Sequence, residues 1–60
     1  MLKLKRIKTG RYITQDNRYI VENYDGFWIA YDAETGQSVV DSEDKLRKIK
    51  ESLESYIKHS

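Results

Sequence analysis

The chain contains no cysteine and no proline, and it has only three glycines and one histidine among its 60 residues. Without cysteine it can form neither a disulfide framework nor a zinc site built on thiolates, and nothing in the composition points to an oxidising compartment. No stretch approaches the about 20 apolar residues of a membrane span, and the N-terminal segment lacks the apolar run of a signal peptide. We therefore expect a cytoplasmic protein that is neither exported nor bound to a membrane.

Groups that commonly perform catalysis are also scarce. The only histidine, His59, is one residue from the end of the sequence, where chain ends fray. The glycines are isolated from one another and no serine lies in a GxSxG elbow, which excludes the common phosphate-binding, dinucleotide-binding and hydrolase motifs. Asp32 and Glu34 lack the spacing of a calcium loop. We expect no enzyme activity, no metal site and no cofactor.

The length and the charge pattern indicate one small domain whose surface has regions of opposite charge. Sixty residues make a single domain, and a chain this short buries only about 60% of the surface that its unfolded form exposes. The net charge of +1 conceals three blocks: residues 1–11 hold five basic and no acidic residues, residues 12–44 hold eight acidic residues against Arg18 alone, and residues 45–60 carry a surplus of three positive charges. Such an asymmetry concerns partners and steering rather than fold.

Residues 11–14 (RYIT) and 18–21 (RYIV) nearly repeat on either side of a turn. Asp16 and Asn17 between them tolerate left-handed backbone, so the pattern predicts an antiparallel hairpin. A two-residue turn there places Arg11 opposite Glu22 and Ile13 opposite Ile20. Because burying the charged face is costly, we expect the other face of the hairpin to meet the core, with these side chains: Tyr12, Thr14, Tyr19 and Val21.

The next strand, FWIAY at residues 27–31, follows a turn at YDG, and the length of that turn decides its register. A three-residue turn over 24–26 places Phe27, Ile29 and Tyr31 beside the core face, whereas a two-residue turn at Asp25 and Gly26 places Trp28 and Ala30 there. We prefer the first because it buries more apolar area, although the sequence leaves both open. A further turn over 32–36 leads to a short fourth strand at 37–40.

After Val40 the apolar period changes to between three and four residues, which predicts a helix over 42–57. Asp41 or Ser42 can cap its start, and the charges of its two ends suit the helix dipole, with these residues involved: Glu43, Asp44, Lys58 and His59. Residues 1–9 form either a basic edge strand, since lysines discourage edge pairing, or a mobile basic arm. The predicted fold class is α+β, a three- to four-stranded antiparallel meander over 10–40 packed on one C-terminal helix.

One helix covers one face of a sheet, so the other face still displays apolar and charged groups. In the preferred register these form a candidate interaction surface, because exposed aromatic and arginine groups resemble the anchors of protein interfaces; its residues are Arg11, Ile13, Arg18, Ile20 and Trp28. We expect a noncatalytic module that binds another protein or itself. The alternative is a small nucleic-acid-binding domain, with candidate phosphate contacts at Lys3, Lys5, Arg6, Lys8 and Arg11.

The sequence from Gly10 to Ile57 also carries a pattern of turns and aromatic strands: a G-x-Y start, D-G before an aromatic pair, and D-x-x-T-G before a short strand. In this it resembles the short open reading frames of bacteriophages and prophages. The resemblance implies a small phage protein that regulates transcription or binds and inhibits a host protein. The order of sheet and helix is similar to that of the DNA-binding domains of integrases and AP2-type factors, which is an analogy of fold alone.

Overall fold

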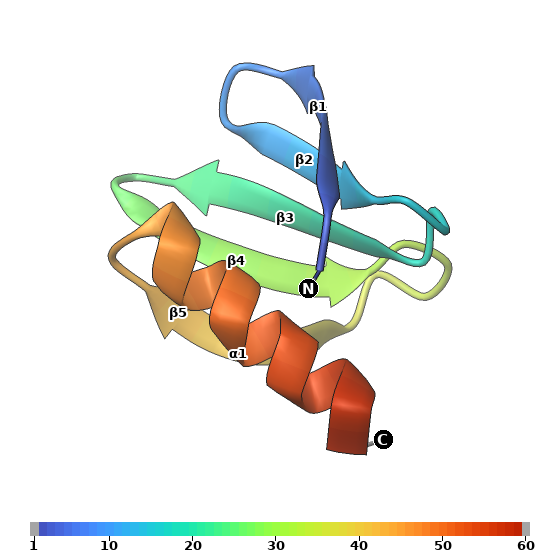
Figure 1. Ribbon diagram of the computed structural model, residues 1–60. Helices are drawn as coiled ribbons and strands as arrows, with labels where there is room; N and C mark the ends of the chain where they lie inside the picture. The colour runs from blue at the N-terminus through green and yellow to red at the C-terminus, as the bar shows by residue number, and fades with distance from the viewer. Residues whose placement is uncertain (1, 60) are drawn as a thin grey trace.

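The structure, a computed structural model, describes residues 2–59, apart from the side chain of Asp41. Within this described part, five antiparallel strands in sequence order form one sheet, and a single helix packs on one of its faces (Figure 1). The elements are β1 (Leu4–Lys8), β2 (Arg11–Thr14), β3 (Tyr19–Tyr24), β4 (Phe27–Asp32), β5 (Ser38–Glu43) and α1 (Leu46–His59). The predicted α+β meander with a C-terminal helix is confirmed, with five strands where three or four were expected.

The additional strand is β1, so the N-terminal segment is an edge strand rather than a free arm. Leu4 pairs with Thr14 and Arg6 pairs with Tyr12, and a bulge at Ile7 separates Arg6 from Lys8. Leu4, together with Leu2, packs against the core cluster. These two leucines supply the apolar contacts that hold the otherwise basic strand on the sheet.

The hairpin of β2 and β3 has the predicted register, with Arg11 opposite Glu22 and Ile13 opposite Ile20. Asn17 takes the left-handed conformation, with φ of 63°. The Thr14 hydroxyl donates to Asp16 Oδ1 at 2.7 Å and accepts from the backbone N–H groups of Arg18 and Tyr19, both at 3.2 Å. Thr14 is therefore a buried polar residue whose hydroxyl is fully used in closing the turn.

The preferred register of β4 is wrong, and the two-residue turn is the one formed. Tyr24 pairs with Phe27 and Val21 pairs with Ala30, which places Ala30 and Trp28 on the helix side of the sheet. Asp25 and Gly26 both have positive φ, 50° and 87°. These angles form the type of two-residue turn whose twist matches that of the flanking strands. The preference for this turn outweighs the larger apolar area that the other register would bury.

The helix begins four residues later than predicted. Ser42 and Glu43 belong to β5, where Glu43 pairs with Trp28, so Ser42 does not cap the helix and its first turn holds no acidic residue. The predicted capping by Asp41 concerns a side chain that lies outside the described part of the chain. The Ser52 hydroxyl donates to Glu43 Oε2 at 3.1 Å and joins strand to helix. Lys58 and His59 occupy the last turn as predicted. This helix is neither long nor apolar enough to cross a membrane.

The core lies between α1 and the sheet. Val21, Ala30, Ile49 and Leu53 are completely buried and Tyr19 nearly so, and α1 packs mainly on β5 and β4. The ring centres of Tyr12 and Trp28 lie 5.9 Å apart, and both rings are on the helix side of the sheet. Tyr12 therefore lies on the face of the hairpin that was predicted to meet the core. Within residues 2–59 no element covers the opposite face, which we call the outer face (Figure 1).

Candidate functional site

The outer face carries two rows of side chains that cross the strands. Strand pairing aligns Lys5, Ile13, Ile20, Tyr31 and Ser38 in one row and Lys8, Arg11, Glu22 and Ile29 in the other. Three half-buried isoleucines, at 13, 20 and 29, therefore come from three neighbouring strands. Each is exposed enough to contact a partner yet already ordered by the sheet.

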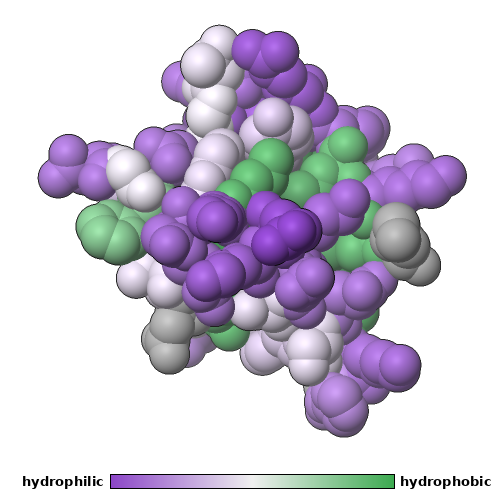
Figure 2. All heavy atoms as spheres, turned by 60° about the vertical axis from the view of Figure 1, so that its left-hand side comes forward, coloured by the Kyte–Doolittle hydropathy of each residue, from purple (hydrophilic) through white to green (hydrophobic). Residues whose placement is uncertain are grey.

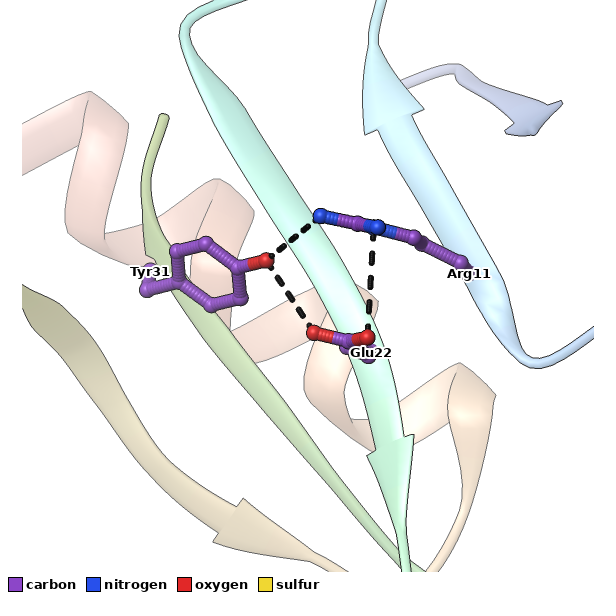
Figure 3. A network of polar contacts seen from close by, with 3 residues as sticks. All are labelled: Arg11, Glu22 and Tyr31. Atoms are coloured by element: carbon purple, nitrogen blue, oxygen red, sulfur yellow. Dashed lines mark hydrogen bonds and ion pairs between the residues drawn. The ribbon is translucent and has the colours of Figure 1, made fainter. Parts of the chain in front are cut away.

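A polar network joins the middle three strands across this face (Figure 3). Arg11 Nη2 donates to the Tyr31 hydroxyl at 3.1 Å, and that hydroxyl donates to Glu22 Oε1 at 3.0 Å. Arg11 Nε lies 3.9 Å from Glu22 Oε2, an ion pair too long for a hydrogen bond. The three side chains thus contact one another within the sheet through two hydrogen bonds and one ion pair.

The surroundings of Tyr31 and Arg11 raise the pKa of both groups, so both stay protonated at neutral pH. Burial raises the pKa of Tyr31, and the neighbouring Glu22 carboxylate raises it further although Arg11 opposes this. The pKa of Arg11 is raised by its hydrogen bond with Tyr31 and by the negative charge of Glu22. At neutral pH Tyr31 therefore remains a neutral hydroxyl that both accepts and donates.

One polar atom of the network has no hydrogen-bond partner among the described residues. Arg11 Nε is buried and makes no hydrogen bond with the described residues, although the Arg11 side chain as a whole is 33% exposed. A guanidinium has five N–H donors in a fixed planar arrangement. The negative charge of Glu22, 3.9 Å away, compensates this buried donor in part.

The structure brings together only part of the predicted interaction surface. Arg11, Ile13 and Ile20 share the outer face as expected. Trp28 does not, because the two-residue turn places it beside Tyr12 on the helix side. Arg18 lies just before β3, with its guanidinium 5.6 Å from the ring centre of Tyr19, a helix-side residue, so it is not at the centre of the outer face.

Phe27, Ile29 and Tyr31 are the outer-face residues that the sequence reasoning missed. All three were assigned to the core side by the wrong register of β4. The signal that could have placed them correctly is the Asp25-Gly26 pair, because this dipeptide between apolar alternating runs is the strongest short-range indication of a two-residue hairpin turn.

Further apolar groups lie at the turn between β3 and β4. Tyr24 and Phe27 pair across it and are 56% and 53% exposed. Figure 2 shows the side of the molecule on the left of Figure 1, where hydrophilic side chains predominate and hydrophobic atoms surface in limited areas between them. Because side chains alternate along β3 and β4, both rings lie on the same side of the sheet as Glu22 and Ile29 and extend the outer face toward this turn.

The candidate phosphate contacts fall into two groups. Lys3, Lys5, Arg6 and Lys8 are exposed along the edge of the sheet, whereas Arg11 is occupied by Tyr31 and Glu22. Pairing with Ile13 places Lys5 on the outer side, and pairing with Tyr12 places Arg6 on the helix side. The basic side chains thus surround an edge rather than form one flat patch.

A hollow lies elsewhere, beside the second half of α1, and is lined by residues that include Leu2, Glu54, Ile57 and His59. Its polar groups serve the fold: the Leu2 N–H donates to Glu54 Oε2 at 2.5 Å, and His59 Nδ1 donates to the Ser55 carbonyl at 2.9 Å. Among the described residues, no three His, Asp or Glu side chains gather to hold a metal ion.

Comparison of the chain with protein-family models, with curated proteins and with solved structures found no significant match.

Proposed function

We propose that this chain is a noncatalytic interaction module that binds another protein chain through the outer face of its sheet. The observation that carries the proposal is the arrangement of Ile13, Ile20 and Ile29 around the Arg11, Tyr31 and Glu22 network on a face that no described element covers. Arginine and tyrosine are enriched among the residues that dominate binding energy. The partner classes are a host protein, as the phage resemblance implies, and a second copy of the chain.

The energetics of the network favour this use of the face. Burying an isolated charge is costly unless it is paired and hydrogen-bonded. On the outer face Arg11 and Glu22 are already bridged by the Tyr31 hydroxyl before any partner arrives. A partner that covers them therefore deprives few polar groups of their hydrogen bonds with water. Burial of the isoleucine side chains stabilises the complex by roughly 25 cal/mol per Å² of apolar area.

The direct test is affinity capture from bacterial lysate with three forms of the protein: wild type, Ile20→Glu and Ser55→Glu. Ile20→Glu places a charge at the centre of the outer face, while Ser55→Glu places the same charge on the exposed side of α1. Capture of a protein, or of further copies of this chain, by wild type and Ser55→Glu but not by Ile20→Glu supports the proposal. Equal capture by all three, with each shown to be folded by circular dichroism, would refute it.

A second candidate function, nucleic-acid binding, is favoured by the edge strand β1. No carboxylate whose side chain the structure describes lies within ion-pair distance of Lys3, Lys5, Arg6 or Lys8. Lys5 and Arg6 donate hydrogen bonds to the neutral side chains of Asn17 and Thr9, so these positive charges remain available to phosphates. Each phosphate contact steepens the dependence of affinity on salt. Recovery of only nuclease-sensitive nucleic acid, with a salt slope that falls when Lys5 and Lys8 are changed to Gln, would favour this function over the first.

A further inference from the structure

We infer that the partner on the outer face is an acidic segment of another protein, whose apolar side chains contact the isoleucines and whose carboxylates meet Lys5 and Lys8 at the β1 edge. This inference rests on the proposed function, because it names the chemistry of the partner at the same face. The partner is selected by the unequal charge of this face and by the apolar groups that lie beside the charge.

The free positive charge of the outer face lies along the edge formed by β1 (Figure 1). Pairing with Ile13 and Arg11 places Lys5 and Lys8 on this side of the sheet, and both lysines are exposed. No carboxylate whose side chain the structure describes lies within ion-pair distance of either. Lys5 Nζ donates to the neutral Asn17 side chain at 3.3 Å, so its positive charge stays uncompensated.

The rest of the outer face offers these lysines no carboxylate. Among the described strand residues of this face the single carboxylate is Glu22, which accepts a hydrogen bond from Tyr31 and is ion-paired with Arg11. At the opposite edge β5 contributes the uncharged Ser38, and Asp25 lies in the turn after β3, two strands away from β1. The described strand residues therefore leave two positive charges uncompensated, both on β1.

Beside this charged edge the face is apolar. Ile13, Ile20 and Ile29 are half-buried on three neighbouring strands, and the rings of Tyr24 and Phe27, 56% and 53% exposed, extend the apolar area toward the turn between β3 and β4. Burial of these groups stabilises a complex in proportion to the apolar area removed from water. The complementary surface therefore combines apolar side chains with carboxylates along one flank.

The same features disfavour two other occupants. A second copy that used the same face would bring Lys5 and Lys8 again and no free carboxylate to meet them. Nucleic acids are bound mainly by cations and by aromatic rings that stack on the bases, whereas the Glu22 carboxylate, which repels phosphate, and the isoleucines occupy the middle of this face. A protein segment with carboxylates satisfies both the charged edge and the apolar centre.

Selection from a phage-displayed library tests the inference, with the immobilised full chain as target and depletion on Ile20→Glu. The library holds random peptides of about 10 residues, long enough in extended form to cross the five strands. Enriched peptides should carry a net negative charge together with apolar residues. Ile20→Thr keeps the β-branched shape and should also weaken their binding, so the test does not depend on one variant folding.

A fluorescein-labelled peptide from this selection then measures the contribution of the two lysines by fluorescence anisotropy. The double variant Lys5→Gln, Lys8→Gln should weaken binding about 3- to 20-fold at about 0.1 M salt, and added salt should reduce the difference. The matched control Lys45→Gln, Lys58→Gln removes two exposed lysines, one just before α1 and one in its last turn. It should change the affinity less than about twofold, because charges beyond about 10 Å are largely screened at this salt.

The outcomes that overturn the inference differ in what they say of the proposed function. Peptides that require Ile20 but show no excess of acidic residues, or that bind the Lys5→Gln, Lys8→Gln variant as tightly as wild type, refute the acidic partner and leave the outer face as a binding surface. If no peptide distinguishes wild type from Ile20→Glu, the acidic segment is also refuted, and the lysate capture separately decides the proposed function. Tighter binding of a fluorescein-labelled oligothymidylate than of the selected peptides, lost in the double variant, would assign the lysines to nucleic acid and overturn the inference.

Discussion

The position of Trp28 can be tested by truncating two consecutive residues that face opposite sides of the sheet. Trp28 is half-buried on the helix side and contacts Tyr12 at 5.9 Å, whereas Phe27 is 53% exposed beside the turn. Removing a fully buried tryptophan side chain costs about 3 to 5 kcal/mol. About half of that applies to Trp28, and the lost ring contact adds about 0.5 to 1 kcal/mol.

Trp28→Ala should therefore lower the free energy of unfolding by about 2 to 3 kcal/mol, a large part of the roughly 3 to 9 kcal/mol expected for 60 residues. Phe27→Ala should cost less than about 1 kcal/mol. Urea unfolding followed by far-ultraviolet circular dichroism measures both without relying on the tryptophan that one variant lacks. Equal stability of Trp28→Ala and wild type, with a larger loss in Phe27→Ala, would show that the faces of β4 are assigned the wrong way round.

Three further predictions concern polar groups. Two of them concern Tyr31 in the network of the outer face, and the third concerns Asp16 in the turn between β2 and β3. Tyr31→Phe should lower stability by about 1 to 2 kcal/mol, because Arg11 and Glu22 lose the hydroxyl between them; unchanged urea unfolding would contradict this. Since the pKa of Tyr31 is raised on folding, its contribution is complete below about pH 10 and is lost as pH rises through the higher folded value, so alkaline unfolding of Tyr31→Phe should lack this phase. The Thr14 hydroxyl and the Arg18 N–H lower the pKa of Asp16, so Asp16 contributes stability above about pH 4 that is lost on acidification, and Asp16→Asn should be less sensitive to acid between about pH 4 and 2 in thermal melts.

The sequence predicted those elements best whose local chemistry allows one arrangement. In the hairpin of β2 and β3, the turn residues Asp16 and Asn17 indicate the register, and the cost of burying Arg11 indicates which face meets the core. The structure has both. The helix face is equally well marked, because Ile49 and Leu53 repeat at helical spacing and both are completely buried.

The errors arose where two physical effects compete. For β4, apolar area favoured one register and the Asp25-Gly26 turn favoured the other, and the turn prevailed. At the start of the helix, Ser42 and Glu43 have the composition of a cap, yet they extend β5 because Glu43 pairs with Trp28 and accepts a hydrogen bond from Ser52. Neither tertiary contact is visible in the local pattern.

The outer face was identified from the sequence, but its composition depended on the register that the sequence left open. Arg11, Ile13 and Ile20 were placed correctly because they lie on the well-determined hairpin. Trp28 and the pair Ile29 and Tyr31 exchanged sides with the register of β4, since a change of one residue moves every side chain of a strand to the other face.

The six isoleucines of the chain, at positions 7, 13, 20, 29, 49 and 57, provide the most direct measurement of binding by the outer face. Their δ1 methyl groups can be observed by NMR while the concentration of the chain, or of a captured partner, is raised. The methyl signals of Ile13, Ile20 and Ile29 should shift together, and those of the buried Ile49 and of Ile57 on α1 should stay in place. Shifts at Ile57 with no change at the three outer-face isoleucines would contradict the outer face as the binding surface.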